Sequence, residues 1–236
     1  MEAHVDVGGS EVLELKGALL VYRGRSRGFV TLHQVCRGRA DGAPFLGEAQ
    51  ELTTEFVHHL AQGLGTRIPT EILPENILVR TAESIVWWTA AKVRTMFFVA
   101  HDEDASKLNG KRFPQPALVW MVSGSDLWVR ALQENRRPCR DTQLMVAPYW
   151  NVDGGTGWTC QGSMRSPDDP GVAAIPQWEQ AFFQSEFTHH TGARKLTSHP
   201  GGFIGLWTSL AGGQRRFPTK HLIAAKETLQ EFITRS

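Results

Sequence analysis

Residues 144–163 read LMVAPYWNVDGGTGWTCQGS, and this stretch places a single cysteine on a glycine-rich loop directly after a short apolar strand. The strand cannot continue through Pro148 as a central strand, because proline has no N–H to donate to a β-ladder. The three glycines between residues 154 and 157 indicate backbone angles that other residues avoid, or a close approach of another segment. Loops held on a rigid scaffold often carry reactive groups, so the stretch predicts a candidate site at Cys160.

Cys160 is the best placed of the three cysteines for thiol chemistry. A free cysteine usually behaves as a small buried hydrophobe, so inert packing is the ordinary interpretation of any one of them. Cys36 ends an apolar strand-like run, which favours packing, and Cys139 follows a proline in a surface turn. Cys160 instead has small and polar neighbours, and the side-chain amide of Asn151 lies nine positions upstream.

The spacing from Gly157 to Cys160 resembles the active-site loop of ubiquitin-conjugating enzymes, in which a His-Pro-Asn turn leads through a glycine to the cysteine that carries the modifier. Here Tyr149-Trp150 stands where His-Pro is expected, and the gap from asparagine to cysteine is slightly longer. More specifically, residues 115–225 resemble PRTRC system protein B, a bacterial family classed as a prokaryotic relative of these enzymes. The matching motifs are Ala147-Pro148-Tyr149, Asn151-Val152, Cys160 to Met164, Trp178-Glu179, Ala181 to Phe183, Ser185, Phe187 to His189 and Pro200 to Gly202.

The composition is that of an ordinary globular protein, and 236 residues are enough to bury a sizeable core. A formal net charge of +1 gives no overall attraction to nucleic acid or membranes. An odd number of cysteines argues against a disulfide scaffold and for a reducing compartment, and neither a signal peptide nor a membrane-length apolar run is visible. We therefore expect a cytoplasmic protein with no membrane segment and no direct contact with nucleic acid.

Hydrophobic periodicity predicts more strands than helices. Strands are expected at 12–22, 29–36, 77–79, 85–88, 96–99, 118–122, 127–132 and 144–146. Helices are expected at 48–62 and at 176–183, which has a proline in its first turn. A last helix is expected from residue 218, because Leu222, Ala225, Leu229 and Phe232 would form one apolar stripe.

These elements predict an α+β fold. We expect an antiparallel β-meander with flanking helices, with a ubiquitin-conjugating-enzyme-like core in the C-terminal half and an N-terminal β-rich extension. No repeat or linker divides the chain, so residues 1–236 are expected to form a single domain. Within it, residues 1–112 would form a β-rich part with one helix, and residues 113–236 the part with the cysteine loop.

The resemblance implies that Cys160 receives a small ubiquitin-like protein from an adenylating enzyme as a thioester and passes it to an amine, without a cofactor. The thiolate is the nucleophile in such chemistry. An amide such as Asn151 would stabilise the tetrahedral oxyanion, although asparagine also caps turns. His189 or the adjacent His190 would act as a base; the sequence does not distinguish them, and the Phe-Thr-His match favours His189.

Other functions fit parts of the sequence. In a non-catalytic adaptor on the same fold, within a plasmid- or mobile-element-encoded system, Cys160 would be structural. A cysteine hydrolase would pair Cys160 with His189, and a DNA-partition accessory protein would need a concentrated basic face that the dispersed arginines do not supply. No metal site is expected, since the chain has no Cys-x-x-Cys motif and no paired ligand spacing.

Overall fold

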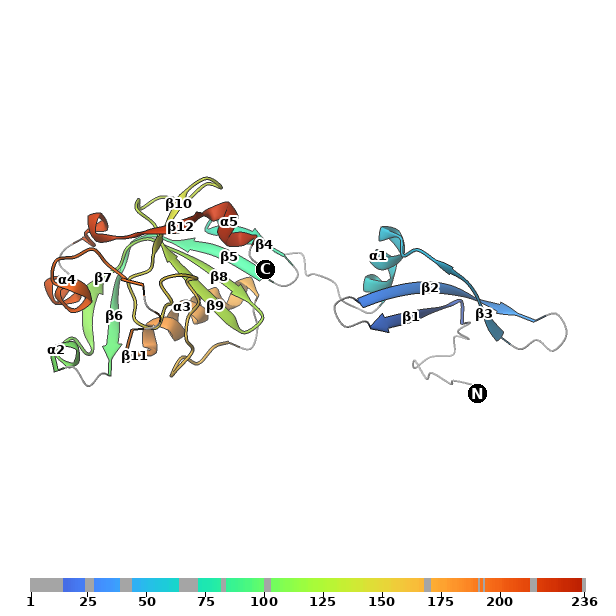
Figure 1. Ribbon diagram of the computed structural model, residues 1–236, viewed down its shortest axis with the longest axis horizontal. Coiled ribbons are helices and arrows are strands. Elements are labelled where there is room, and N and C mark those ends of the chain that lie inside the picture. The colour runs from blue at the N-terminus through green and yellow to red at the C-terminus, as the bar shows by residue number, and fades with distance from the viewer. Residues whose placement is uncertain are drawn as a thin grey trace. The chain divides into compact units, whose positions relative to one another are not determined.

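The computed structural model divides the chain into two compact units, Met1–Thr70 and Glu71–Ser236 (Figure 1). The structure describes residues 15–23, 28–38, 44–63, 72–81, 84–99, 103–167, 171–190, 192, 194–212 and 216–234. In this part of the chain, no helix is both long enough and apolar enough to cross a membrane.

The N-terminal unit is an antiparallel meander in the order β1-β2-β3, followed by a helix. The elements are β1 (Gly17–Arg23), β2 (Gly28–Arg37), β3 (Pro44–Gln50) and α1 (Thr54–Gly63). The two strands predicted here are confirmed within the described residues, while residues 12–14 and the tip of their turn lie outside them. The predicted start of the helix at residue 48 is wrong, because residues 44–50 pair with β2 instead.

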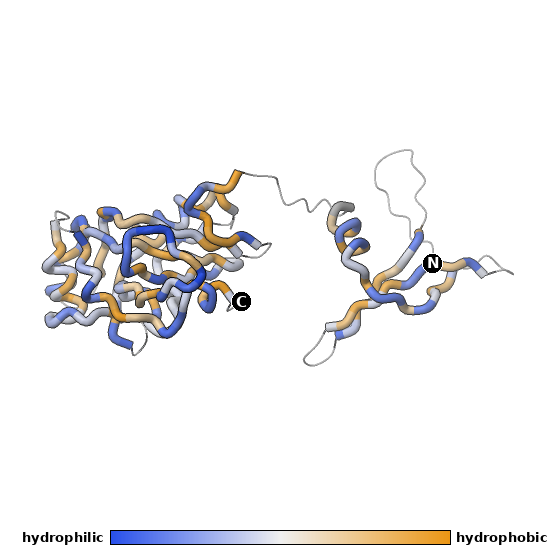
Figure 2. The backbone as a smooth tube through the Cα atoms, turned by 90° about the horizontal axis from the view of Figure 1, so that it is seen from above, coloured by the Kyte–Doolittle hydropathy of each residue, from blue (hydrophilic) through white to orange (hydrophobic). Residues whose placement is uncertain are grey.

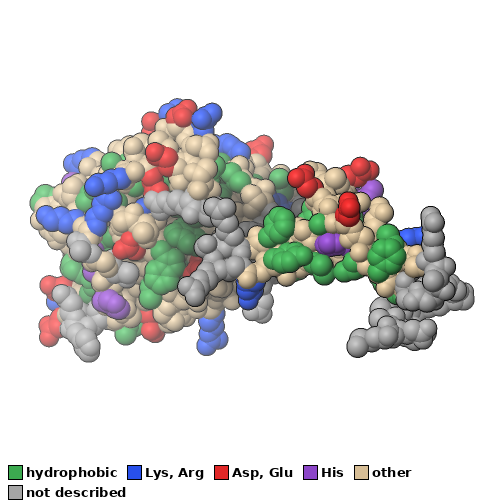
Figure 3. Space-filling model, turned by 45° about the vertical axis from the view of Figure 1, so that its right-hand side comes forward, with side chains coloured by type: hydrophobic (Ala, Val, Ile, Leu, Met, Phe, Trp, Pro, Cys, Tyr) green, Lys and Arg blue, Asp and Glu red, His purple; other side chains and the backbone are tan. Residues whose placement is uncertain are grey.

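Hydrophobic side chains gather on the surface of the N-terminal unit (Figure 3). Val21 is 75 % exposed and Phe29 is 63 % exposed. Among the described residues of this unit, only Thr31 and His33 are buried, and their side chains are hydrogen-bonded to each other. The described part of the unit therefore leaves most of its apolar surface uncovered.

The C-terminal unit is built on a six-stranded antiparallel sheet in the order β12-β10-β9-β8-β5-β4. A second sheet has the order β11-β6-β7, in which β11 runs parallel to β6. The strands are β4 (Ile77–Arg80), β5 (Ser84–Thr89), β6 (Val93–Phe98), β7 (Lys111–Pro114), β8 (Leu118–Ser123), β9 (Asp126–Ala131), β10 (Gln143–Val146), β11 (Glu186–Phe187) and β12 (Ala224–Thr228). The α+β class and the strands predicted between residues 77 and 146 are confirmed.

The six-stranded sheet separates two hydrophobic clusters, because successive side chains of a strand point to opposite faces. In β8, Leu118, Trp120 and Val122 belong to the larger cluster, whereas Val119 and Met121 belong to the smaller one. Figure 2 shows hydrophobic stretches in orange within the C-terminal unit, with hydrophilic stretches in blue between them. β8 is buried on both faces, which explains its nearly continuous apolar sequence.

Helices complete the C-terminal unit. They are α2 (Glu103–Ser106), α3 (Ile175–Gln184), α4 (Gly202–Leu210) and α5 (Leu229–Ile233), with short 3₁₀ turns at Val172–Ala174 and Thr219–His221. Trp178 of α3 and Trp207 of α4 enter the larger cluster, and Phe232 of α5 enters the smaller one. The helix expected at 176–183 is confirmed, and α4 was not predicted.

The expectation of one helix from residue 218 onward is wrong. Residues 224–228 form β12, which pairs with β10, and α5 begins only at Leu229. Thr228 caps α5 in a capping box with Glu231. The apolar residues that predicted one helix are divided between a strand and a short helix. Their spacing fits a single helical stripe only when the two elements are taken as one.

Residues 77–114 belong to the same unit as the cysteine loop. β5 pairs with β8 along its whole length, from Ser84 opposite Ser123 to Thr89 opposite Leu118. The contacts divide the chain near residue 70, whereas the internal boundary expected from the sequence lies at 112/113. A core shared by all 236 residues stays a prediction.

Candidate functional site

The loop between β10 and α3 closes into a narrow hairpin that sets Cys160 beside Asn151. The Cys160 N–H donates to the Asn151 carbonyl oxygen at 2.8 Å. One step further along, Val152 and Thr159 form an antiparallel bridge, and the Asp153 N–H donates to the Trp158 carbonyl at 2.8 Å. The main chains of the two predicted site residues therefore lie side by side, although nine positions separate them.

This hairpin lies along β9, next to the point where β10 leaves it. β10 pairs with β9 only at Arg130 and Ala131. Beyond them, the Val129 N–H donates to the Gly157 carbonyl, and the Thr159 N–H donates to the Leu127 carbonyl, both at 2.8 Å. The cysteine loop thus replaces β10 as the hydrogen-bonding neighbour of β9. Cys160 comes immediately after Thr159, the last residue that the loop bonds to this strand.

The tip of the hairpin is closed by Asp153. Its carboxylate accepts the Thr156 N–H at 2.6 Å and the Thr156 hydroxyl at 2.8 Å. Burial opposes ionisation of Asp153, but these hydrogen bonds outweigh it and hold the pKa of the carboxyl below its usual value. Gly157 then turns the chain with a φ of +79°, a conformation that favours glycine.

A buried arginine also hydrogen-bonds to the tip of the hairpin. Arg130 of β9 is fully buried and donates to the carbonyls of Gly154 and Gly155, at 3.3 and 2.5 Å. Its Nε pairs with Glu227 of β12 at 2.7 Å. Burial, with a smaller effect of Arg194, lowers the pKa of Arg130 to about 10, so the guanidinium stays charged at neutral pH. The tip of the loop is therefore hydrogen-bonded to an arginine that also forms an ion pair inside the protein.

Cys160 itself is a free, partly buried thiol. Side chains on both sides of it reach the turn between β8 and β9: Trp158 donates its indole N–H to Asp126 at 3.0 Å, and Gln161 donates to the Ser125 carbonyl at 2.7 Å. Trp158 is still 36 % exposed, whereas Trp150 packs inward against Phe203 with ring centroids 4.6 Å apart. The thiol is thus accessible on a loop whose backbone is tied at several points.

The sequence that forms this site also matches the model of a known protein family. The sequence profile of prokaryotic E2 family D matches residues 53–225, which is more than half of the chain and includes the whole cysteine loop. The chain belongs to prokaryotic E2 family D. Comparisons with curated proteins and with solved structures found no match. The family agrees with the expected resemblance to a prokaryotic conjugating-enzyme relative, and the match begins further towards the N-terminus than residue 115.

In this prokaryotic E2 protein, the Asn151 side chain has a structural partner. It is only 5 % exposed, and its Nδ2 donates to the Glu186 carbonyl at 2.8 Å. The Glu186 N–H in turn donates to the Ser163 hydroxyl at 2.8 Å. Both ends of the cysteine segment are therefore fastened to the main chain of Glu186.

The predicted base lies apart from this network. His189 is exposed, and its Nδ1 lies 2.9 Å from the Thr188 hydroxyl. The neighbouring His190 is also exposed and bonds to the Arg194 carbonyl. Within the described residues, no hydrogen bond joins either histidine to Cys160. The structure thus brings Asn151 and Cys160 together and does not join His189 to them.

Sequence reasoning missed the residues that hold the prokaryotic E2 loop in place. Arg130 was the available signal, because it is a single charge inside the apolar strand Leu127 to Leu132. No sequence pattern near Arg130 points to its partners Glu227, Gly154 and Gly155, since they are distant from it in the chain. Among the described residues, no group of three or more His, Cys, Asp or Glu side chains is arranged to hold a metal ion.

Proposed function

We propose that this prokaryotic E2 protein carries a small ubiquitin-like protein as a thioester on Cys160. The observation that supports this most directly is the hairpin that holds a partly accessible Cys160 against Asn151 in a member of this family. A carrier thiol has to meet two proteins in turn, so it needs an open position on a backbone that does not move. The hydrogen bonds to β9 and Glu186 supply the fixed backbone.

The proposed reaction has two steps. In the first, the Cys160 thiolate attacks the C-terminal carbonyl carbon of the ubiquitin-like protein, activated as an acyl-adenylate or thioester by an adenylating enzyme. A carbon–sulfur bond forms, AMP or the activating thiol leaves, and the thiol proton passes to solvent. In the second step, an amine attacks the same carbon, an amide bond forms, and the Cys160 thiolate leaves while the amine loses a proton.

Asn151 and His189 have accessory roles in this proposal. The Asn151 amide has two N–H donors, and one is used on the Glu186 carbonyl. The second is the donor we assign to the oxyanion of both tetrahedral intermediates. His189 is exposed, so an incoming amine could reach it and pass it a proton.

The test combines the protein with an adenylating protein and a small ubiquitin-like protein of the kind that the proposal requires, with ATP, on a non-reducing gel. We expect an adduct that disappears on reduction and is absent in Cys160→Ala. Cys160→Ser should give an adduct that resists reduction, because an ester replaces the thioester. Cys139→Ala is the matched control, since Cys139 is a free and exposed thiol whose loss should leave the adduct unchanged.

A non-catalytic adaptor is the second candidate, and one observation favours it. The Asn151 amide already bonds to Glu186, and in the described part of the chain no side chain hydrogen-bonds the Cys160 sulfur. An adaptor would bind the same two proteins with equal affinity before and after Cys160→Ala, and it would form no adduct. Measuring both binding and adduct formation therefore separates the two functions.

A further inference from the structure

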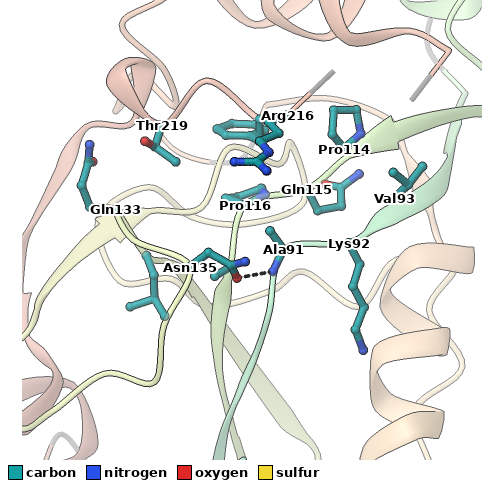
Figure 4. Close-up of a pocket in the computed structure, with 13 residues that line it drawn as sticks. Ala91, Lys92, Val93, Pro114, Gln115, Pro116, Gln133, Asn135, Arg216 and Thr219 are labelled. Carbon is teal, nitrogen blue, oxygen red and sulfur yellow. Dashed lines mark hydrogen bonds between the residues drawn. The ribbon is translucent and has the colours of Figure 1, made fainter. Parts of the chain in front are cut away.

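A cavity of about 540 Å³ lies at the end of the sheet opposite the cysteine loop (Figure 4). Ala117 and Leu132, which line it, are joined by a 2.8 Å hydrogen bond at the open end of the β8–β9 hairpin. The cysteine loop is tied to the closed end of the same hairpin, at Ser125. At a rise of about 3.3 Å per residue, the two ends are roughly 20 Å apart. The cavity is therefore separate from the Cys160 site.

The inner surface of the cavity combines apolar side chains with polar groups. Pro114, Pro116, Leu132 and Phe217 contribute hydrophobic walls. Gln115 forms a polar part of the wall, but its amide group is already engaged. Its Nε2 donates to the Met96 sulfur and the Phe113 carbonyl, and its Oε1 accepts the buried Tyr149 hydroxyl at 2.8 Å. Gln115 thus fixes the shape of the cavity without offering a donor, and a volume of this size suits a small ligand.

Donors are concentrated at the rim. Figure 4 shows the Arg216 side chain over Pro116, between Thr219 and Pro114, whereas Lys92 extends away from the others. Asn135 uses its Oδ1 to accept the Ala91 N–H at 2.7 Å, which leaves its Nδ2 as a donor. Gln133 and Thr219 add an amide and a hydroxyl. Among the described residues, the Arg216 guanidinium and three neutral donors therefore surround the opening, while the second lining cation, Lys92, points away from it.

The charge at the rim is uncompensated. No Asp or Glu lines the cavity, and among the described residues Arg216 has no acidic partner within ion-pair distance. A guanidinium beside an apolar surface attracts an anion, and its planar fork fits the two oxygens of a carboxylate. A single guanidinium over the opening matches one negative charge better than the two of a phosphate.

We propose that this cavity binds a carboxylate carried on a compact apolar body. The carboxylate forms an ion pair with Arg216 and accepts a further hydrogen bond from Asn135, Gln133 or Thr219. The apolar body of the ligand lies against Pro114, Pro116 and Phe217. Two sources share this chemistry: a free small carboxylic acid, and the C-terminal carboxylate of a polypeptide that ends in an apolar residue. The proposal does not depend on the function of Cys160.

The test uses the full ¹⁵N-labelled chain and records backbone amide shifts during titration. The probes are 4-methylpentanoate and acetyl-Gly-Gly-Leu with a free carboxylate, each compared with its carboxamide. We expect the carboxylates to shift the amides around Ala117 and Leu132, and the carboxamides to bind about tenfold more weakly or not at all. Tighter binding of the peptide than of the free acid identifies a chain terminus as the ligand. Equal or weaker binding of the peptide identifies a small molecule.

Variants test the assigned residue. Arg216→Gln should weaken carboxylate binding about tenfold or more, while Arg112→Gln should leave it unchanged. Arg112 is a suitable control because it is an exposed arginine that does not line the cavity. Cys160→Ala should bind the probes like the unmodified protein, so loss of the carrier function would not affect this result.

Several outcomes would overturn the proposal. Equal binding of carboxylate and carboxamide would show a purely apolar site. This comparison uses the unmodified protein, so it does not depend on whether a variant folds. Tighter binding of inorganic phosphate, with shifts at the same amides, would assign the cavity to phosphate instead. Unchanged carboxylate affinity in Arg216→Gln, or no shift with any probe, would leave no role for the cavity in carboxylate binding.

Discussion

Arg130 and Glu227 form an ion pair inside the C-terminal unit, with Nε and Oε1 2.7 Å apart and side chains 0 % and 4 % exposed. The pair joins β9 to β12, and β10 lies between these two strands in the sheet. Because the same guanidinium donates to the carbonyls of Gly154 and Gly155, the pair connects the sheet to the cysteine loop. Arg130 therefore contributes both to the stability of the sheet and to the placement of the cysteine loop.

Replacing Arg130 with methionine should lower the free energy of unfolding by about 3–5 kcal/mol, because the buried Glu227 carboxylate loses its ion pair with Arg130. Urea unfolding followed by tryptophan fluorescence measures this change. The double variant Arg130→Met/Glu227→Met should recover part of the loss. Arg136→Met is the control: its pair with Glu134 is exposed, and the expected change is no more than about 1 kcal/mol.

The same variants separate stability from loop order. Both Arg130→Met and the double variant lack the donors to Gly154 and Gly155, so alkylation of Cys160 should be altered equally in the two. If the double variant restored the alkylation rate together with stability, Arg130 would act on the fold alone.

Gly157→Ala should destabilise the protein more than Gly162→Ala. Both glycines have positive φ, +79° and +45°, which costs an alanine about 1–2 kcal/mol. At Gly157 the new Cβ would also lie 3.0 Å from the Val129 carbonyl and 3.1 Å from the Arg130 guanidinium, whereas at Gly162 nothing lies within 4 Å. Urea unfolding of the two variants compares these costs directly, and equal losses would contradict the close approach at Gly157.

Asn151→Ala should slow transfer from Cys160 to an amine more than Ser163→Ala does. Both changes remove one hydrogen bond to the main chain of Glu186, and each should cost about 0.5–1.5 kcal/mol of stability. Only Asn151 is assigned to the oxyanion. The measurement is single-turnover discharge of a preformed adduct to free lysine. Similar rates for the two variants would make Asn151 a structural residue and would favour the adaptor.

Cys139 should react with iodoacetamide at lower pH than an ordinary thiol. Hydrogen bonds from the Thr142 hydroxyl, and then from the backbone of Asp141, lower the pKa of Cys139. A lowered pKa means that more thiolate is present at a given pH below the titration midpoint, so the rate profile should shift towards acid. In a Cys36→Ala/Cys160→Ala background, Thr142→Val should move the midpoint back up; an unchanged midpoint would exclude the hydrogen bond as the cause.

The strands of the sheet could be predicted because their signal is local. The segments 118–122 and 127–132 carry strand-forming residues on both sides of a glycine-containing turn, and β8 and β9 formed there. The segment from residue 218 misled because its spacing fits a helix, while pairing with β10 made residues 224–228 a strand. α4 was missed because it begins at a glycine.

The sequence alone determined the antiparallel α+β character, the family and the position of the cysteine on a glycine-rich loop after a strand ended by proline. These properties depend on residue type and short-range order, which every copy of the chain carries whether folded or not. Only the tertiary structure decided that Arg130 meets Glu227 and the glycine carbonyls, that Asn151 bonds to Glu186, and that Arg216 overhangs a cavity. Such contacts join residues distant in the chain, and their geometry follows from packing of the whole unit.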